Sequence, residues 1–563
     1  MTSFYVQKIP SFNQLKVEPE EKEEDEPIEH PSHVIGGWGP TQRRIVLYLV
    51  LIYMVAPFSN SHFVFTAPTA DFYCVDFDPK TNQTVYLKNS CQVGNYSGAP
   101  DCKKFEHDRS FHRRTLVNNF DLVCDKSWYP SFAQSIHQMG YAVSGVVLGI
   151  ISDKHGRFFT AKIAIALEIV AGFGQAFSPN IYYYWFARFF VGIAAYGRFL
   201  NGYILISEWV GPTLRGRIAS SVYEMGSFMG TALCLAAFYF YPDYIVIEVT
   251  VRIIEILLFV GYIFIVKESP RWLLTHGKWD EVNRLLKSTA LEAAKYTETE
   301  IDRRIDSLKE FTLKEQEKLE KQQQEKASIF DIWKDPELLK TSLILYFSWF
   351  SLAFINYAAG LNIGQYGVSI YAISLFGTVT GIPKLALTYW LVGRFERKNL
   401  GRTCLYTKVG CLLGTVICAI SPSLIIPLII VSRVSKIAGG IALKTLYLMS
   451  AEFFPTNMRQ TSIGICSVFA RMGSIVAPFI KELTIATYLW VPFVIFTALS
   501  VLTATLWLFL PETMDIQLPD NVLQSKEVEQ QEVKVRARRE SRLMSRRMSQ
   551  LPSKVTRRHF SVA

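Results

Sequence analysis

Long apolar runs alternate with short charged segments along most of this 563-residue chain. A helix needs about 20 mostly apolar residues to cross roughly 30 Å of membrane hydrocarbon. The pattern therefore predicts an all-α membrane protein with twelve transmembrane helices. The runs lie near residues 45–66, 130–151, 160–178, 181–206, 217–240, 245–266, 340–360, 367–392, 403–421, 424–450, 461–480 and 485–510.

Charged motifs recur at matching positions in the two halves of the chain, and most of the matched residues are separated by 244 positions. The matches are Glu208 with Glu452, Arg215 with Arg459, Glu268 with Glu512, and the segment 153–157 with the segment 393–397. Each motif follows a long apolar run, so the repeated unit contains about six spans. Two pseudo-symmetric six-helix halves are typical of a secondary transporter.

Positive charge is concentrated in the short loops after even-numbered spans, whereas the short loops after the third, fifth and ninth spans contain neither Lys nor Arg. Positive loops stay on the cytoplasmic side of a membrane, so we expect both termini to be cytoplasmic. The expected order is a cytoplasmic tail at 1–44, a six-helix half at 45–266 with a large extracellular loop at 67–129, cytoplasmic linker helices at 267–339, a second six-helix half at 340–510, and a basic cytoplasmic tail at 511–563.

The long loop between the first two spans has the features of an extracellular segment. Its four cysteines can close two disulfides in any of three pairings, and free thiols are the alternative. Two Asn-X-Ser/Thr sequons can accept glycans only on this side of the membrane. The cysteines are Cys74, Cys91, Cys102 and Cys124, and the sequon residues are Asn82 and Asn95.

The linker and the C-terminal tail are both highly charged. The linker mixes Leu and Ala with Lys and Glu, which predicts amphipathic helices against the cytoplasmic face, with a flexible linker as the alternative. In the tail, Ser541 and Ser549 each follow an Arg pair by two residues, as in substrates of basophilic kinases. Phosphorylation would release such a tail from anionic lipid. A solvated tail without membrane contact is the alternative.

Motifs for enzymatic chemistry are absent from the sequence. The segment 439–445 resembles a phosphate-binding loop, but it lacks the Gly before Lys444 and lies inside an apolar span. HExxH, paired CxxC and GxSxG motifs do not occur. We therefore expect no enzyme, cofactor, metal site or nucleic-acid partner, and transport that runs on gradients or exchange. A channel is also compatible with the composition.

Seven segments together point to one family. They are residues 119–125, 153–157, 208–211, 268–273, 367–371, 451–456 and 510–513. With these segments the chain, from about residue 34 to 519, resembles the organic ion transporters of the major facilitator superfamily, solute carrier family 22. It departs from the family pattern at Phe158 and Phe159, where basic residues usually stand, and at Gly393, where the second copy often has Asp.

The resemblance implies alternating access, in which a central cavity between the halves opens to one side of the membrane at a time. The repeated charged residues would then form ion pairs across the halves when the cytoplasmic side is closed. Helix capping and topology determination are the alternative roles. These gate residues are Asp153, Arg157, Glu208, Arg215, Arg397, Glu452 and Arg459.

The resemblance also bears on the charge of the substrate. Arg471 occupies a position where anion and zwitterion carriers typically have Arg and cation carriers commonly have Asp. Lys436 matches a family lysine, and Lys384 lies within one residue of a lysine found in anion carriers. A positive cavity binds carboxylates, sulfates or zwitterions through charge-assisted hydrogen bonds. Neutralisation by acids within the spans is the alternative, and these acids are Glu168, Glu224, Glu248 and Glu255.

Aromatic side chains are expected to form the apolar walls of the substrate site. Several match family positions, although Asn356 stands where anion carriers often have a second Tyr. Packing within the bundle is the alternative role for each of them. The candidates are Tyr223, Trp349, Tyr357, Tyr371 and Tyr447.

These observations favour a transporter of organic anions or zwitterions in the plasma membrane, whose partners are a small organic ion and membrane lipid. An organic cation transporter is the runner-up, because Glu224 or another buried acid could dominate the cavity. A non-transporting sensor on the same fold is a third hypothesis. The sequence indicates neither a coupling ion nor an oligomeric state.

Overall fold

The computed structural model describes residues 28–513, with gaps at 29, 36, 61, 69–70, 79–82, 95, 97–98, 212–214, 323–335, 363, 365–367, 393 and 455–458. The sequons at Asn82 and Asn95, and the tail serines Ser541 and Ser549, lie outside the described residues. The side chains of Arg215 and Arg459 lie outside them as well.

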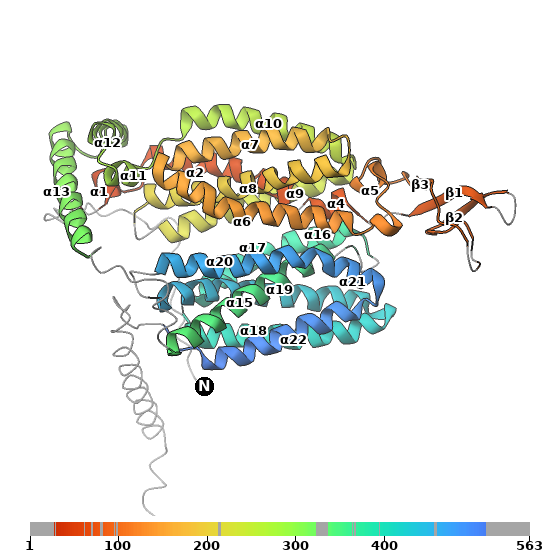
Figure 1. Ribbon diagram of the computed structural model, residues 1–563. Helices are drawn as coiled ribbons and strands as arrows, with labels where there is room; N and C mark the ends of the chain where they lie inside the picture. The colour runs from red at the N-terminus through yellow and green to blue at the C-terminus, as the bar shows by residue number, and fades with distance from the viewer. Residues whose placement is uncertain are drawn as a thin grey trace, which may run out of the picture.

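The apolar runs fold into two helix bundles that lie side by side (Figure 1). The first bundle contains α2 (Pro40–Tyr53), α3 (Ala56–Asn60), α4 (Phe63–Thr66), α6 (Tyr129–His155), α7 (Arg157–Ala176), α8 (Ile181–Trp209), α9 (Arg215–Phe240) and α10 (Tyr244–Ile265). The second contains α15 (Pro336–Leu361), α16 (Ile370–Val379), α17 (Gly381–Val392), α18 (Arg397–Ile420), α19 (Ile425–Phe453), α20 (Arg459–Val476), α21 (Ile480–Ala486) and α22 (Trp490–Leu506). These regions also contain two short helices, α1 (Pro31–Ile35) and α5 (Leu116–Asn119), and four 3₁₀ turns, η2 (Cys124–Lys126), η5 (Pro422–Leu424), η6 (Ala477–Phe479) and η7 (Trp507–Phe509).

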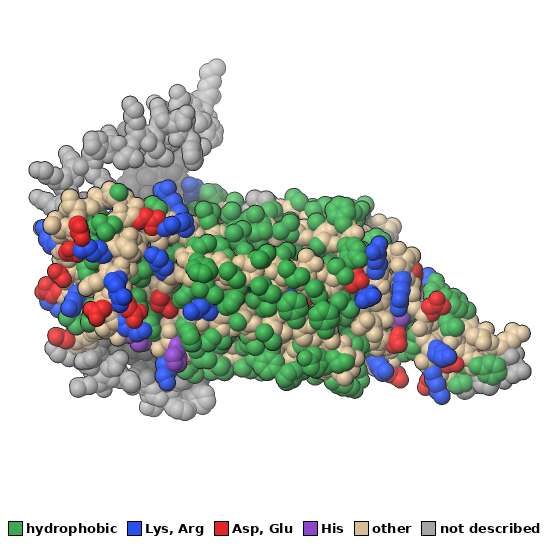
Figure 2. Space-filling model, turned by 90° about the horizontal axis from the view of Figure 1, so that it is seen from above, with side chains coloured by type: hydrophobic (Ala, Val, Ile, Leu, Met, Phe, Trp, Pro, Cys, Tyr) green, Lys and Arg blue, Asp and Glu red, His purple; other side chains and the backbone are tan. Residues whose placement is uncertain are grey.

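Ten helical segments within the described residues are long and apolar enough to cross a membrane. The two other expected spans are α9 and α10, which have 26 and 22 residues. Hydrophobic side chains cover the middle of the long face in Figure 2, and charged side chains gather toward its two ends. This distribution is the one that a hydrocarbon layer requires.

The helices differ in detail from the expected spans, and the ninth span begins at Arg397, six residues earlier than 403. The first begins at Pro40, five residues earlier than 45, because Pro is well suited to the first helical position. The eighth is divided into α16 and α17, since Pro383 cannot donate to the preceding turn and its ring crowds that turn. The eleventh is interrupted by η6, which contains Pro478. Apolar length alone did not reveal these breaks.

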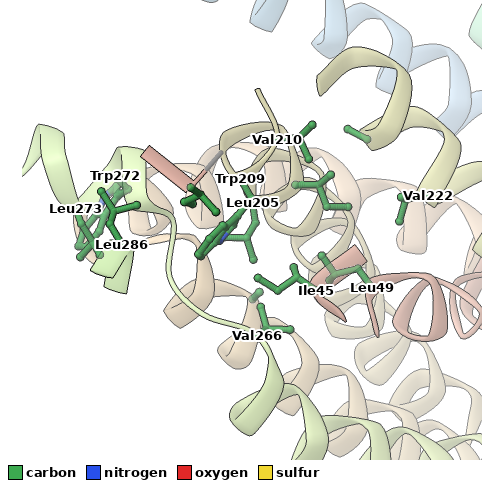
Figure 3. Close-up of a cluster of buried hydrophobic side chains, with 14 of the residues drawn as sticks. Ile45, Leu49, Leu205, Trp209, Val210, Val222, Val266, Trp272, Leu273 and Leu286 are labelled. Atoms are coloured by element: carbon green, nitrogen blue, oxygen red, sulfur yellow. The ribbon is translucent and has the colours of Figure 1, made fainter. Parts of the chain in front are cut away.

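The segment after the first bundle forms three helices, α11 (Pro270–Thr275), α12 (Trp279–Ala293) and α13 (Glu298–Gln322). They lie at one end of the first bundle in Figure 1, which we call the linker end. Trp272 and Leu286 from these helices belong to the same buried cluster as Trp209 of α8 and Ile45 of α2 (Figure 3). Burial of apolar surface therefore attaches this segment to the bundle.

The loop between α4 and α6 contains a three-stranded antiparallel sheet in the order β2-β1-β3, which the expected all-α class omitted. Its strands are β1 (Phe72–Asp78), β2 (Gln83–Lys88) and β3 (Phe105–His107). Cys74 pairs with Cys102 and Cys91 with Cys124, so the structure selects one of the three possible pairings. The sheet projects from the end of the first bundle opposite the linker (Figure 1), and we call this end the sheet end.

Glycine allows α6 and α8 to approach each other closely. A Cβ atom on Gly140 would lie 2.3 Å from the carbonyl oxygen of Phe189 and 2.9 Å from the backbone nitrogen of Ile193. The facing Gly192 is equally constrained, since its Cβ would lie 2.3 Å from the carbonyl oxygen of His137. Small residues at such crossings let helix backbones pack directly in a membrane.

We predict that Gly140→Ala destabilises the protein by about 1–3 kcal/mol, because the added methyl group overpacks this crossing. Gly149 on the same helix is a matched control, since nothing lies within 4 Å of its Cβ position. Gly149→Ala should be neutral or stabilising, because Ala has the higher helix propensity. Thermal unfolding of the two purified variants checks this, and equal melting temperatures would contradict the assigned packing.

Candidate functional site

A cavity of about 670 Å³ lies between the two bundles. Its walls come from both bundles: Glu224 and Phe228 on α9, Tyr357 on α15, and further residues on α17 and α19. A ligand bound here would therefore touch both halves of the protein. Cavities of this size between helices are typical sites for small molecules.

Three of the predicted substrate residues line this cavity, namely Lys384, Lys436 and Tyr357. Asn356, which departs from the family pattern, lines it beside Tyr357. Arg433 also contributes to the wall, and its Nη2 donates to the carbonyl oxygen of Ile373 at 2.9 Å. The cavity wall formed by the second bundle is therefore rich in cations.

Arg471 lies at the contact between the bundles. Its guanidinium carbon is 4.4 Å from the ring centroid of Tyr196 and 5.3 Å from that of Tyr141, both in the first bundle. Cation–π contacts of this kind hold an Arg side chain in place. Arg471 and predicted Tyr223 are not among the residues that line the cavity. Tyr223 packs instead against Phe199, with ring centroids 4.5 Å apart.

Two other predicted aromatic residues pack against each other in the second bundle. Trp349 is buried and donates its Nε1–H to Ser450 Oγ at 3.0 Å. The rings of Trp349 and Tyr447 have centroids 5.0 Å apart. The structure thus places Trp349 in the bundle interior, with Tyr447 against it, and neither is among the residues that line the cavity.

Tyr371 lies at the sheet end, away from Lys384 and Lys436. Its hydroxyl donates to the carbonyl oxygen of Phe238 in the other bundle at 3.2 Å. Its ring stacks on Phe65 with centroids 5.3 Å apart, and Phe65 in turn lines the central cavity. Tyr371 also lines a separate pocket of about 340 Å³ near Phe111. The structure therefore places Tyr371 in a contact between the bundles.

Further contacts join the bundles at the sheet end. Ser131 Oγ donates to Glu482 at 2.7 Å, and Ser135 Oγ donates to the carbonyl oxygen of Ile475 at 2.7 Å. Lys481 Nζ lies 3.4 Å from the carbonyl oxygen of Ala67. These hydrogen bonds join the two bundles at the sheet end.

The predicted gate residues form ion pairs at the linker end, but each described pair lies within one bundle. Arg157 is 3.3 Å from Glu208 and 3.2 Å from Asp153 in the first bundle. Arg397 is 3.5 Å from Glu452 in the second. The repeated residues thus form equivalent pairs in the two halves.

The repeat extends to the glutamates that follow each bundle. Glu268 accepts hydrogen bonds from the backbone nitrogens of Arg157 and Phe158 at 2.9 and 3.0 Å, at the start of α7. Glu512 accepts from the backbone nitrogens of Arg397 and Lys398 at 3.0 and 3.1 Å, at the start of α18. A carboxylate at a helix N-terminus satisfies unpaired N–H groups and interacts favourably with the helix dipole.

Acids buried in the first bundle are paired within that bundle. Glu168 is 2.8 Å from Arg198 and 3.7 Å from Arg252, and Arg252 also pairs with Glu248 and Glu255. Three of the four span acids are therefore held by arginines of their own bundle. The alternative that these acids neutralise the cavity lysines has no support from their positions.

The fourth acid, Glu224, pairs across the bundles with Lys444 at 3.4 Å. Glu224 is the one carboxylate among the described residues that line the cavity. Its partner Lys444 was recognised in the sequence only as an additional cation. The two residues come together only because the two bundles pack against each other, and sequence spacing does not encode that packing.

Two cations near the cavity, Lys408 and Arg433, were not identified as candidates from the sequence. The scarcity of acidic residues in the second half could have pointed to these two cations. Residues 338–511 contain no Asp, and their three Glu residues lie near helix ends. The cations inside these spans consequently have few possible acidic partners within their own bundle. The three glutamates are Glu396, Glu452 and Glu482.

Comparison with known proteins agrees with this architecture. The profile of a family described as Major Facilitator Superfamily matches residues 127–432. The chain belongs to the Major Facilitator Superfamily. Among solved structures, this facilitator is similar to the inward-open xylose transporter XylE from E. coli, with a TM-score of 0.57 and 15% identity over 85% of this chain and 98% of that one. This likeness concerns the fold alone.

Curated relatives of the facilitator include organic cation and organic anion transporters, in agreement with the resemblance found in the sequence. The facilitator is 27% identical to the Organic cation transporter protein of Drosophila melanogaster, over 87% of this chain and 92% of the relative. It is 29% identical to Organic anion transporter 3 of Oryctolagus cuniculus, over 74% and 77%. Solute carrier family 22 member 13 of Homo sapiens is 28% identical, over 72% and 71%. The protein is a multi-pass membrane transporter.

We predict that Glu268→Gln and Glu512→Gln each destabilise the facilitator by about 1–3 kcal/mol, because each removes a charge-assisted cap on two helix N–H groups. Glu310→Gln is the control, since the Glu310–Lys314 pair is exposed and solvent screens its charges. Thermal unfolding of the three variants measures the difference. Similar effects of all three would contradict the capping role.

Proposed function

We propose that this facilitator carries organic anions or zwitterions across the plasma membrane by alternating access. In the proposed orientation the sheet end faces outward and the linker end, with both tails, faces the cytoplasm. The two disulfides of the sheet support this assignment, because disulfides persist in oxidising compartments. The distribution of Lys and Arg among the short loops supports it independently.

The charge balance of the cavity is the observation that carries the choice of substrate. Lys384, Arg433 and Lys436 line it, whereas its one described carboxylate, Glu224, is paired with Lys444. Charge inside a membrane protein is costly unless it faces an opposite charge or a water-filled cavity. An anionic group on the substrate would supply that opposite charge through charge-assisted hydrogen bonds.

Arg471 is proposed to contact the anionic group of the substrate at the boundary between the bundles. Its contacts with Tyr141 and Tyr196 hold the guanidinium toward the first bundle. A carboxylate bound by Arg471 would be held at this boundary, so substrate occupancy would influence how the bundles meet. Tyr357 would supply an apolar wall for the rest of the molecule.

The described contacts correspond to a state in which the sheet end is closed. Opening that end requires breaking the hydrogen bonds of Ser131, Ser135 and Tyr371 across the bundles. Closing the linker end would bring the pairs Arg157–Glu208 and Arg397–Glu452 together. Each pair lies within one bundle, so the pairs would bias the two states only through a network that forms between them when the linker end closes.

Transport of organic cations is the second candidate, and one observation favours it. Glu224 lines the cavity, and its side chain remains 34% exposed beside Lys444. If Lys444 moved away, the carboxylate would be available to a cationic ligand. The relatives include both organic cation and organic anion transporters, so the family does not decide between these substrates.

Uptake in cells that express the full chain tests the proposed function. A labelled panel of organic anions, zwitterions and organic cations should show uptake of anions or zwitterions. Arg471→Asp should reduce that uptake by about 10- to 150-fold, since a hydrogen bond to a charged group contributes about 1.5–3 kcal/mol. Arg471→Lys should retain part of it.

Surface expression must be equal in all cells. The control for general effects of removing a cation is Lys162→Met, which changes a lysine on α7 that lies beside Phe158. Selective uptake of cations by the unaltered chain would overturn the proposal. Absence of uptake of every panel member, despite ligand binding, would favour a sensor.

Glu224→Gln separates the two candidate substrates. For an anion carrier the variant should retain uptake within about fivefold, because it removes only a partly exposed ion pair worth about 0–1 kcal/mol. For a cation carrier the same variant lacks the carboxylate that would bind the substrate, and uptake should be lost. The variant is measured beside the unaltered chain with one anion and one cation.

A further inference from the structure

Lys408 of α18 is buried in the second bundle and is not used by the proposed substrate site. Lys408 is 1% exposed, and its Nζ has no hydrogen-bond or ion-pair partner among the described residues. An unpaired ammonium in a dry interior is costly. The Lys408 amine is therefore either neutral in the folded protein or balanced by an anion.

Gly439 of α19 packs closely against the Lys408 side chain. A Cβ atom on Gly439 of α19 would lie 3.0 Å from Lys408 Nζ and 3.1 Å from Asn356 Oδ1. Any larger residue at position 439 would crowd both polar groups. Glycine thus lets the side chains of Lys408 and Asn356 approach α19 closely.

A pocket of about 30 Å³ adjoins this ammonium. Its polar lining consists of Lys408, Asn356, Ser432, Arg433, Ser435 and Lys436, and no carboxylate is among its described lining residues. Hydroxyl, amide and cationic groups can all donate hydrogen bonds. Phe493 and Phe496 complete the wall, and the edges of aromatic rings carry partial positive charge. The lining is complementary to an anion.

The size of the pocket limits what can bind. A volume of about 30 Å³ accommodates roughly one to two water-sized particles, so a monatomic anion fits inside it, whereas an organic carboxylate, sulfate or phosphate would fit only in part. A carboxylate of the chain is an unsuitable partner, because the three glutamates of residues 338–511 lie near helix ends. Chloride is the small monatomic anion that is available on both sides of a cell membrane.

We propose that the pocket at Lys408 binds a chloride-sized monatomic anion, at a site that adjoins the cavity for the organic substrate. This inference does not depend on which organic ion is carried. Asn356, Arg433 and Lys436 line both spaces, so a bound halide would lower the positive potential of the cavity. The halide would then act on substrate affinity through these shared residues.

The test is a halide titration of the purified full-length chain in lipid nanodiscs, with gluconate replacing chloride at constant ionic strength. The melting temperature should rise with chloride and with bromide and then follow the logarithm of concentration. At ten times the dissociation constant, the folding equilibrium should shift roughly elevenfold. A melting temperature that is independent of halide would overturn the proposal.

Lys408→Met removes the charge while keeping the length of the side chain. This variant should melt at a higher temperature than the unaltered chain in gluconate, and chloride should not change its melting temperature. If Lys408→Met does not fold, Ser435→Ala makes a smaller change in the same pocket and should weaken the apparent halide affinity several-fold. An unchanged halide response in whichever of these two variants folds would overturn the proposal.

Lys384→Met is the matched control, because Lys384 lines the central cavity but not the small pocket. It should keep the full halide response. Loss of the response in Lys384→Met, with retention in Lys408→Met, would place the anion in the central cavity and overturn the site. These readouts do not require uptake, so failure of the transport proposal would be seen separately.

Discussion

The high free energy of an unpaired charge in hydrocarbon is the constraint on which the interior of this protein depends. The first bundle meets it internally, since Glu168, Glu248 and Glu255 lie beside Arg198 and Arg252. The second bundle places cations at its cavity without a comparable set of acids. The two halves share a fold and a set of repeated motifs but differ in their internal charge. In our proposals, ligands supply the missing negative charge.

The repeated motifs serve a different purpose from the cavity residues. Glu268 and Glu512 hold the starts of α7 and α18 through backbone N–H groups, and Arg157 and Arg397 extend from those helix starts to Glu208 and Glu452. Each unit joins several helices of one bundle at the linker end. A bundle fixed in this way can move as a rigid body, which is what alternating access between two halves requires.

The residues that would change between states lie at the contacts between the bundles. At the sheet end these contacts are hydrogen bonds and aromatic stacking, as for Tyr371 with Phe238 and Phe65. In the middle, Lys444 contacts Glu224 and Arg471 contacts Tyr196. The polar contacts among them are hydrogen bonds, one ion pair and cation–π contacts, and a substrate that binds one state better than the other shifts the balance between states.

The sequence by itself determined the ten membrane-length helices of the described residues, the repeated motifs, the superfamily and three residues that line the cavity, Tyr357, Lys384 and Lys436. These features follow from apolar length, repeat spacing and local motifs, which are properties of contiguous residues. Only the tertiary structure decided the disulfide pairing, the sheet, the place of Tyr371 at the sheet end, the Lys444–Glu224 pair and the burial of Lys408. Each of these depends on how a helix is rotated about its axis and which distant segment faces it, and side-chain packing across the bundles sets both.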